Sequence, residues 1–253
     1  MPDAQRDIHV YPTTPALLEA TAQHLLDHAR LAIAARNSFT IALAGGSTPK
    51  GLYAMLAALP FRSQLDWTKV RFFWGDERHV PPDHADSNYR MAHEALLSRV
   101  PVSMAHVHRV PSELPDAQTA ADRYEAVLRE QFDVAEPDIP RFDFILLGMG
   151  PDGHTASLFP GTRAVQATSR LVAAPWVEKF QTSRITFTPV LLNHARQVTF
   201  LICGHAKAET LHAVLEGPFQ PDVLPAQIIG PRDGTLTWFV DLEASGALTF
   251  LQQ

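Results

Sequence analysis

The sequence has little of several features that define other classes of protein. It contains one cysteine in 253 residues, so no disulfide can form within the chain. That thiol, Cys203, lies in an apolar run, where a buried side chain is the simplest interpretation. No apolar run approaches the ~18 residues that a membrane-spanning helix needs, and the first thirty residues contain no continuous apolar block. We therefore expect a cytoplasmic protein that does not bind membranes.

Positive charge is also scarce. Lysine and arginine total 21 against 27 aspartates and glutamates, which leaves a net charge of −6, and only four of the basic residues are lysines. Such a balance gives no general attraction for nucleic acid or an anionic membrane surface, so we expect neither as a partner. An anionic ligand must then be held by a few local cations.

Short apolar runs that end on glycine recur along the chain. They are of strand length and occupy residues 40–44, 70–74, 142–147 and 198–203. Continuous rather than alternating apolarity is typical of strands covered on both faces. The runs therefore predict a mostly parallel sheet flanked by helices on both faces, a Rossmann-like α/β architecture. Because no repeat or low-complexity tract divides the chain, residues 1–253 are predicted to form a single domain.

Three segments between these runs have the spacing of amphipathic helices, namely residues 14–33, 121–132 and 208–215. The first is predicted to have Thr14 as its cap and Pro15 at its first helical position. In sheets of this kind, ligands bind beyond the carboxyl ends of the strands, which is where the glycines fall. The glycine junctions are therefore the candidate functional site.

The first junction, residues 45–49 (GGSTP), precedes a predicted helix over residues 50–59. Glycines let backbone N–H groups approach a ligand, Ser47 or Thr48 can cap the helix, and a helix N-terminus favours an anion. The segment lacks the Lys-Ser/Thr ending of a nucleotide P-loop and the second glycine of a serine-hydrolase elbow. It is either a phosphate cradle or a well-capped turn.

Two further segments carry charge beside predicted strands. Asp76, Glu77 and Arg78 follow the second apolar run almost directly. Arg78 can hold a phosphate in bidentate geometry, and Asp76 or Glu77 can orient it. Lys179, one of the four lysines, lies shortly before Arg184 and is a candidate for a second phosphate cation. For both segments a solvated loop is the alternative interpretation.

The third junction, residues 148–155 (GMGPDGHT), places Asp152 and His154 on a tight turn after a strongly apolar run. A histidine with an ordinary pKa near 6.5 suits a general base at neutral pH, and a carboxylate two residues away can orient it. The segment formally contains G-x-G-x-x-G. However, neither the long helix nor the acidic residue of a nicotinamide-binding fingerprint follows it. No cluster has metal-ligand spacing, so no metal site is predicted.

Together these segments resemble the glucosamine-6-phosphate isomerase/6-phosphogluconolactonase family, at its 6-phosphogluconolactonase branch. The matching stretches, in order along nearly the whole chain, are residues 45–49 (GGSTP), 74–78 (WGDER), 86–90 (DSNYR) and 148–161 (GMGPDGHTASLFPG). Lys179 also stands five residues before Arg184, as the family's loop lysine stands before its Arg-hydrophobic-Thr strand. The resemblance implies a fold shared with sugar-phosphate deaminases and isomerases.

The resemblance also implies a carboxylic ester hydrolase of the oxidative pentose phosphate pathway. It would open 6-phospho-D-glucono-1,5-lactone to 6-phospho-D-gluconate without a cofactor, as a monomer or small homo-oligomer whose partner is this small lactone. By position, His154 is implied to be the base that activates water, and Asp152 its supporting carboxylate. The implied substrate-binding residues are Gly45, Gly46, Ser47, Thr48, Asp76, Arg78, Lys179 and Arg184.

Three alternatives stay open: a sugar-phosphate isomerase or deaminase of the same fold, a non-catalytic sugar-phosphate-binding protein, and a nicotinamide dehydrogenase. The deaminase branch follows its Asp-Gly-His turn with an acidic residue in a Phe-Asn-Glu-Pro type sequence. This chain has residues 157–160 (SLFP) there, which favours ester hydrolysis over isomerisation. A lactonase further requires that His154, Arg78 and Lys179 converge on one cleft.

Overall fold

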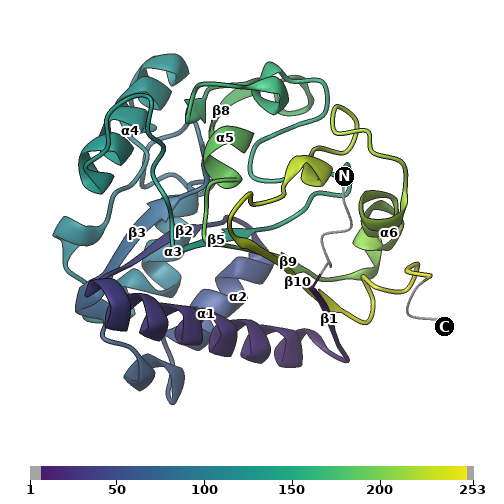
Figure 1. The fold of residues 1–253 in the computed structure, drawn as a ribbon, viewed down its shortest axis with the longest axis horizontal. Helices are drawn as coiled ribbons and strands as arrows, with labels where there is room; N and C mark the ends of the chain where they lie inside the picture. Colours follow the sequence, from purple (N-terminus) through teal and green to yellow (C-terminus); the bar gives the residue numbers. More distant parts are fainter. Residues whose placement is uncertain (1–6, 250–253) are drawn as a thin grey trace.

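The computed structural model describes residues 7–249, which are arranged around a central six-stranded sheet (Figure 1). Its strands are β1 (Asp7–Tyr11), β2 (Phe39–Leu43), β3 (Val70–Trp74), β5 (Phe144–Leu147), β9 (Gln197–Ile202) and β10 (Thr235–Asp241). They lie in the order β1-β10-β9-β5-β2-β3, and every neighbouring pair is parallel. The predicted parallel sheet is therefore confirmed.

The four apolar runs correspond to the four strands β2, β3, β5 and β9. All residues of β2, β5 and β9 are buried, as continuous apolarity predicts. The sequence patterns did not indicate β1 or β10. In β1, polar and apolar side chains are interleaved and none is fully buried, because this strand lies at the sheet edge with a single neighbour. A strand whose side chains are partly exposed to solvent has no continuous apolar run in its sequence.

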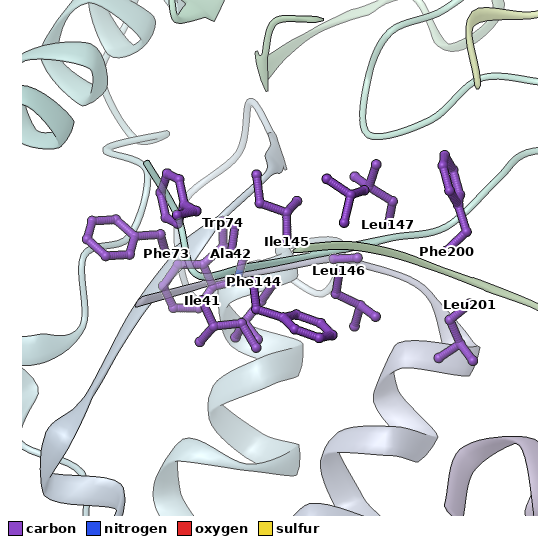
Figure 2. Close-up of a cluster of buried hydrophobic side chains, with 14 of the residues drawn as sticks. Ile41, Ala42, Phe73, Trp74, Phe144, Ile145, Leu146, Leu147, Phe200 and Leu201 are labelled. Carbon is purple, nitrogen blue, oxygen red and sulfur yellow. The ribbon is translucent and has the colours of Figure 1, made fainter. Parts of the chain in front are cut away.

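Helices cover both faces of the sheet, as predicted. In the view of Figure 1, α1 (Thr14–Arg36) and α2 (Ser47–Leu56) lie beneath it, and α4 (Ala117–Phe132) and α5 (Pro189–Leu192) lie above it. Figure 2 shows that consecutive side chains point to opposite faces, Leu146 towards the lower helices and Leu147 away from them. Both sides join one buried core, which extends from Leu17 to Leu248.

Two helix starts differ from their predictions by a residue or more. The cap of α1 is Thr13, whose hydroxyl accepts from Ala16 N at 3.3 Å, and not Thr14. Helix α2 runs from Ser47 to Leu56 instead of residues 50–59. Its cap is Gly46 at a φ of +103°, without a side-chain bond. The first glycine pair and the helix start are thus one continuous turn, which shifts the helix three residues towards the strand.

A second, antiparallel sheet was not predicted. It consists of β4 (Asp76–Arg78), β8 (Thr182–Phe187) and β6 (Val172–Ala173), and β7 (Trp176–Val177) also pairs with β8. Gly75 joins the two sheets: its N–H donates to Leu43 O at 3.0 Å, and its carbonyl accepts from Phe187 N at 2.8 Å. These strands have two to six residues, too short for a recognisable period.

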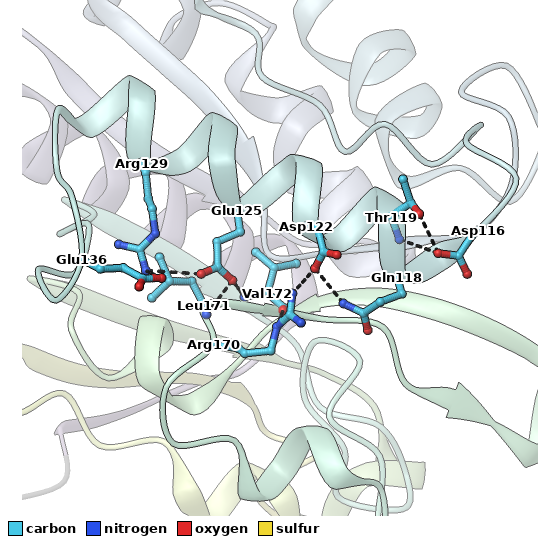
Figure 3. Close-up of polar contacts among 10 residues, drawn as sticks. All are labelled: Asp116, Gln118, Thr119, Asp122, Glu125, Arg129, Glu136, Arg170, Leu171 and Val172. Carbon is cyan, nitrogen blue, oxygen red and sulfur yellow. Dashed lines mark hydrogen bonds and ion pairs between the residues drawn. The ribbon is translucent and has the colours of Figure 1, made fainter.

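Helix α4 anchors the small sheet through side chains on one of its faces (Figure 3). The Glu125 carboxylate accepts from the backbone N–H groups of Leu171 at 3.0 Å and Val172 at 3.1 Å. Asp122 pairs with Arg170 from the preceding turn of the helix. These bonds hold the chain at the start of β6 and so support β8, the strand that carries Arg184. The remaining α-helices within residues 7–249 are α3 (Asn88–Ala95) and α6 (Ala208–Glu216).

Candidate active site

The carboxyl ends of β2, β3, β5 and β9 open into one cleft of about 810 Å³. Its walls include residues 43–49, 75–76, 146–151 and 201–203, so the four glycine junctions meet at one edge of the sheet as predicted. Parallel strands bring their carboxyl ends together, whatever the distance between them in the sequence.

The first junction forms one wall of the cleft. Gly45, Gly46, Ser47 and Thr48 all line it. Because α2 begins at Ser47 and has no side-chain cap, its first N–H groups and the positive end of its dipole are directed towards the cleft. Thr48 Oγ1 lies 2.8 Å from Cys203 Sγ, which ties this wall to the end of β9. The geometry is compatible with the predicted anion cradle.

The two carboxylates of the second junction have different surroundings. Glu77 is buried and accepts from the N–H groups of Asn88 at 2.7 Å and Tyr89 at 2.8 Å, which begin α3. It is a structural cap and does not orient Arg78, contrary to one option for this segment. Asp76 lines the cleft and accepts from Ser157 Oγ at 2.7 Å. Burial raises the pKa of Glu77 despite these bonds.

Arg78 and Arg184 are opposite each other in the β4–β8 pair, and both line the cleft. Arg78 donates to Asp86 O at 2.7 Å, and the Arg184 guanidinium lies 5.2 Å from the centre of the Phe180 ring. Neither forms an ion pair with a carboxylate in residues 7–249. Burial, and then the Arg78 charge, lower the pKa of Arg184. Two adjacent cations without a carboxylate partner form a suitable site for an anion.

The third junction presents an oriented histidine. Asp152 Oδ1 and His154 Nδ1 are hydrogen-bonded. The imidazole lines the cleft and stacks on the ring of Phe159, with 4.1 Å between the ring centroids. A Cβ on Gly150 would lie 2.1 Å from the imidazole, so only glycine lets the ring sit against this turn. The hydrogen bond, and next the charge of His154, hold the pKa of Asp152 well below its ordinary value.

Lys179 lies in the loop that leads into β8. It belongs to a short 3-10 turn over Glu178–Phe180, and its ammonium lies 3.3 Å from Asp152 Oδ2. Its neighbour Phe180 lines the cleft, but Lys179 is not among the lining residues. Of the three residues expected to converge, His154 and Arg78 share the cleft directly, whereas Lys179 contacts the carboxylate that orients the histidine.

One cation of the cleft was missed in the sequence. Lys207 lines the wall after β9, three residues beyond Gly204, and burial lowers its pKa. The signal was present, because Lys207 is one of only four lysines and follows the fourth glycine junction. Cys203, expected to be buried, is half-buried and also lines the cleft.

Two further findings concern metal ligands and membrane-spanning helices. Within residues 7–249, no three His, Cys, Asp or Glu side chains gather closely enough to hold a metal ion. Over the same span, no helix combines the length and apolarity needed to cross a bilayer.

Comparison with known proteins assigns this chain to a family. The model of glucosamine-6-phosphate isomerases/6-phosphogluconolactonase matches residues 12–238. The chain belongs to this family. Within the glucosamine-6-phosphate isomerase/6-phosphogluconolactonase family, a 6-phosphogluconolactonase of Synechocystis sp. is 45% identical over 84% of this chain and 86% of its own. One of Nostoc sp. is 39% identical over 97% of this chain and 99% of its own.

Solved structures of the family share the fold. A 6-phosphogluconolactonase from Trypanosoma cruzi aligns with a TM-score of 0.86 at 31% identity, covering 97% of each chain. A monomeric glucosamine-6-phosphate deaminase aligns with a TM-score of 0.80 at 19% identity, over 95% of this chain and 99% of its own. At that identity the second match shows the fold alone, so the fold is common to both branches of the family.

Proposed function

We propose that this protein hydrolyses 6-phospho-D-glucono-1,5-lactone to 6-phospho-D-gluconate, with His154 activating the attacking water. The observation that carries the proposal is one cleft that holds both a carboxylate-bound imidazole and the unpaired guanidinium groups of Arg78 and Arg184. The names of the similar proteins support the same substrate.

The hydrogen bond to Asp152 determines which nitrogen of His154 acts. A carboxylate with a strongly lowered pKa is ionised at neutral pH and can only accept, so His154 Nδ1 carries the proton. The lone pair is then on Nε2, which has no hydrogen bond to any residue from 7 to 249. Nε2 is therefore free to take a proton from water, and Asp152 stabilises the imidazolium that forms.

A δ-lactone is an activated ester, so no covalent nucleophile is needed. Water attacks C1 as His154 Nε2 accepts its proton, and the carbonyl oxygen becomes an oxyanion held by N–H donors of a glycine turn at the cleft. When the tetrahedral intermediate collapses, the bond from C1 to the ring oxygen breaks. The imidazolium then returns its proton to that oxygen, which yields the open acid and regenerates the neutral histidine.

The substrate phosphate is assigned to Arg78 and Arg184. Guanidinium groups bind phosphate in bidentate geometry, and two that lack a carboxylate partner have donors to spare. Lys179, the second phosphate cation expected from the sequence, stays a prediction. Anchoring the phosphate fixes C1 with respect to His154, and such positioning lowers the barrier without new chemistry.

The deaminase alternative is disfavoured because this chain has no carboxylate at the position where the deaminase branch carries its acid. Where that branch carries an acid in its Phe-Asn-Glu-Pro type sequence, this chain has Phe159, whose ring stacks on His154. A purely binding protein has no need of a histidine held by a carboxylate and is therefore the weaker alternative. A cytoplasmic location, a single domain and the oligomeric state stay predictions.

A coupled assay tests the proposal. Glucose-6-phosphate dehydrogenase generates the lactone, 6-phosphogluconate formation is followed, and the rate without protein is subtracted because this lactone opens unaided. We expect a rate proportional to protein concentration. Ammonia release from glucosamine 6-phosphate would instead identify a deaminase, and binding of the sugar phosphate without turnover of either substrate would identify a binding protein.

A further inference from the structure

The face of the small sheet that borders the cleft carries two pairs of opposed side chains. Alternate residues of a strand point to the same face, so Asp76 and Arg78 share one face of β4. Across from them on β8 stand Thr186 and Arg184, in that order. The two arginines, here called the arginine pair, line the cleft, whereas Ser157 lies against the other pair.

Ser157 is hydrogen-bonded to both members of the pair that it covers. Its hydroxyl donates to Asp76 Oδ2 at 2.7 Å, and its backbone N–H donates to Thr186 Oγ1 at 3.1 Å. All three residues are buried, and a hydrogen bond to a carboxylate is stronger than one between neutral groups. Within residues 7–249, no other hydrogen bond or ion pair joins residues 148–160 to β4 or β8. The polar connection between the segment of His154 and the small sheet therefore runs through one residue.

A strained residue lies between His154 and Ser157. Ala156 has a φ of +47°, in the left-handed region that alanine adopts only at a cost in free energy. The turn is closed by the N–H of Leu158, which donates to Thr155 O at 2.9 Å. Such a conformation persists only where surrounding contacts enforce it, and the two bonds of Ser157 are contacts of that kind. They hold the chain after the histidine against the small sheet.

We propose that Ser157 is a positioning residue that fixes the separation between the base His154 and the arginine pair. Each bond of Ser157 ends two residues from one arginine, Arg78 on β4 or Arg184 on β8. A lactone whose phosphate is bound by the arginine pair then presents C1 at one distance from the imidazole. The inference rests on the proposed function and adds to it: the cleft selects its substrate by the distance between lactone carbonyl and phosphate.

The first test measures Ser157→Ala on the 6-phosphorylated lactone and on unphosphorylated glucono-1,5-lactone, with spontaneous opening subtracted. For the phosphorylated lactone we expect kcat to fall about 10- to 100-fold and KM to change by less than about threefold, because the phosphate still binds while C1 is misplaced. For the unphosphorylated lactone, kcat/KM should stay within about twofold of the wild type, because that ring is not tied to the arginine pair. Equal losses for the two lactones would overturn the inference, since Ser157 would then only support the histidine.

Thr155→Val is the matched control. Thr155 is a buried hydroxyl residue of the same segment, and its Oγ1 donates to Gly148 O at 2.8 Å, so it bonds the turn to itself and not to the small sheet. Its replacement should change kcat/KM by the same factor for both lactones. Thermal unfolding confirms that both variants are folded. A loss in Thr155→Val that is confined to the phosphorylated lactone would show that any loosening of the turn has this effect, and would contradict the inference.

The second test needs the phosphorylated lactone alone. Ser157→Ala is combined with Arg184→Met, and kcat/KM is measured for both single variants and the double variant. A phosphate held by one guanidinium can shift, so removal of the Ser157 hydroxyl should lower kcat/KM by less than about threefold in the Arg184→Met background. Multiplication of the two losses would refute the inference. Absence of lactone turnover in the wild type would instead count against the proposed function.

Discussion

Arg78 and Arg184 stand opposite each other across β4 and β8, and neither forms an ion pair with a carboxylate among residues 7–249. Like charges directly across an antiparallel pair are destabilising, so the free protein carries an electrostatic cost at this position. An anion between the two side chains removes that cost. We therefore expect an anion bound between the two arginines to stabilise the small sheet.

Removing one of these charges should weaken binding without harming the fold. For Arg184→Met, which keeps an apolar stem of similar length, we expect KM for the phosphorylated lactone to rise about 10- to 100-fold, the cost of charge-assisted hydrogen bonds. The Tm of the ligand-free protein should stay the same or rise, because a repulsion is relieved. Steady-state kinetics and thermal unfolding measure the two effects. An unchanged KM would contradict the phosphate assignment.

The same pair predicts a response to inorganic phosphate. Added phosphate should raise the Tm of the wild type, because a ligand that binds only the folded protein stabilises it by mass action. In Arg184→Met the shift should be smaller at equal phosphate concentration. Chloride at matched ionic strength is the control, since screening alone acts on both proteins. Equal shifts in the two proteins would place phosphate elsewhere.

Replacement of the general base should affect turnover more than binding. General base catalysis typically contributes ~10²–10⁴ in rate, so His154→Ala should lower kcat by about that factor with little change in KM. Single-turnover and steady-state assays, corrected for spontaneous opening of the lactone, check this. A variant with the kcat of the wild type would remove His154 from the mechanism.

A single methyl group at residue 150 should displace the histidine. In Gly150→Ala the new Cβ would lie 2.1 Å from imidazole atoms and 2.6 Å from Asp152 Oδ1, so the pair must move. We expect kcat to fall at least tenfold, because catalysis depends on ångström-scale placement. Gly230→Ala, away from the residues that line the cleft, is the control, since its Cβ would meet nothing within 4 Å. Similar kinetics for both variants would show that the turn tolerates displacement.

Acid should destabilise the protein through a histidine remote from the cleft. Burial, and then the neighbouring His28, lower the pKa of His24 to about 4, and its ring packs against Phe144 and Phe239. The unfolded chain protonates this group below about pH 6.5, while the folded protein resists protonation down to about pH 4. Stability should therefore fall as the pH drops from about 6.5 to 4.

The change His24→Gln tests this dependence. Glutamine can still bond to Thr199, which lies 3.3 Å from His24 Nε2, but it does not titrate. Between pH 7 and pH 5 the Tm should drop less in the variant than in the wild type. Part of the drop will remain, because burial also lowers the pKa of His28 and of His108. Parallel Tm curves for the two proteins would exclude His24 as a contributor.

The sequence alone determined four of the six strands of the central sheet and the place of the site. Strands β2, β3, β5 and β9 are covered on both faces, and continuous apolarity records this directly. Each is followed by a glycine within two residues, and ligand sites in parallel sheets lie beyond such ends, so the cleft followed from local pattern. The turn that holds Asp152 beside His154 is equally local, because a single residue separates them.

Only the tertiary structure decided which distant charges face each other. Residues 78 and 184 are brought together by a short antiparallel pair with no sequence period of its own, and Lys179 meets Asp152 across 27 positions of the chain. Whether Glu77 faces a ligand or caps α3 likewise depends on where that helix begins in space. Ion pairing depends on three-dimensional distance and on competition between partners, and a one-dimensional pattern contains neither.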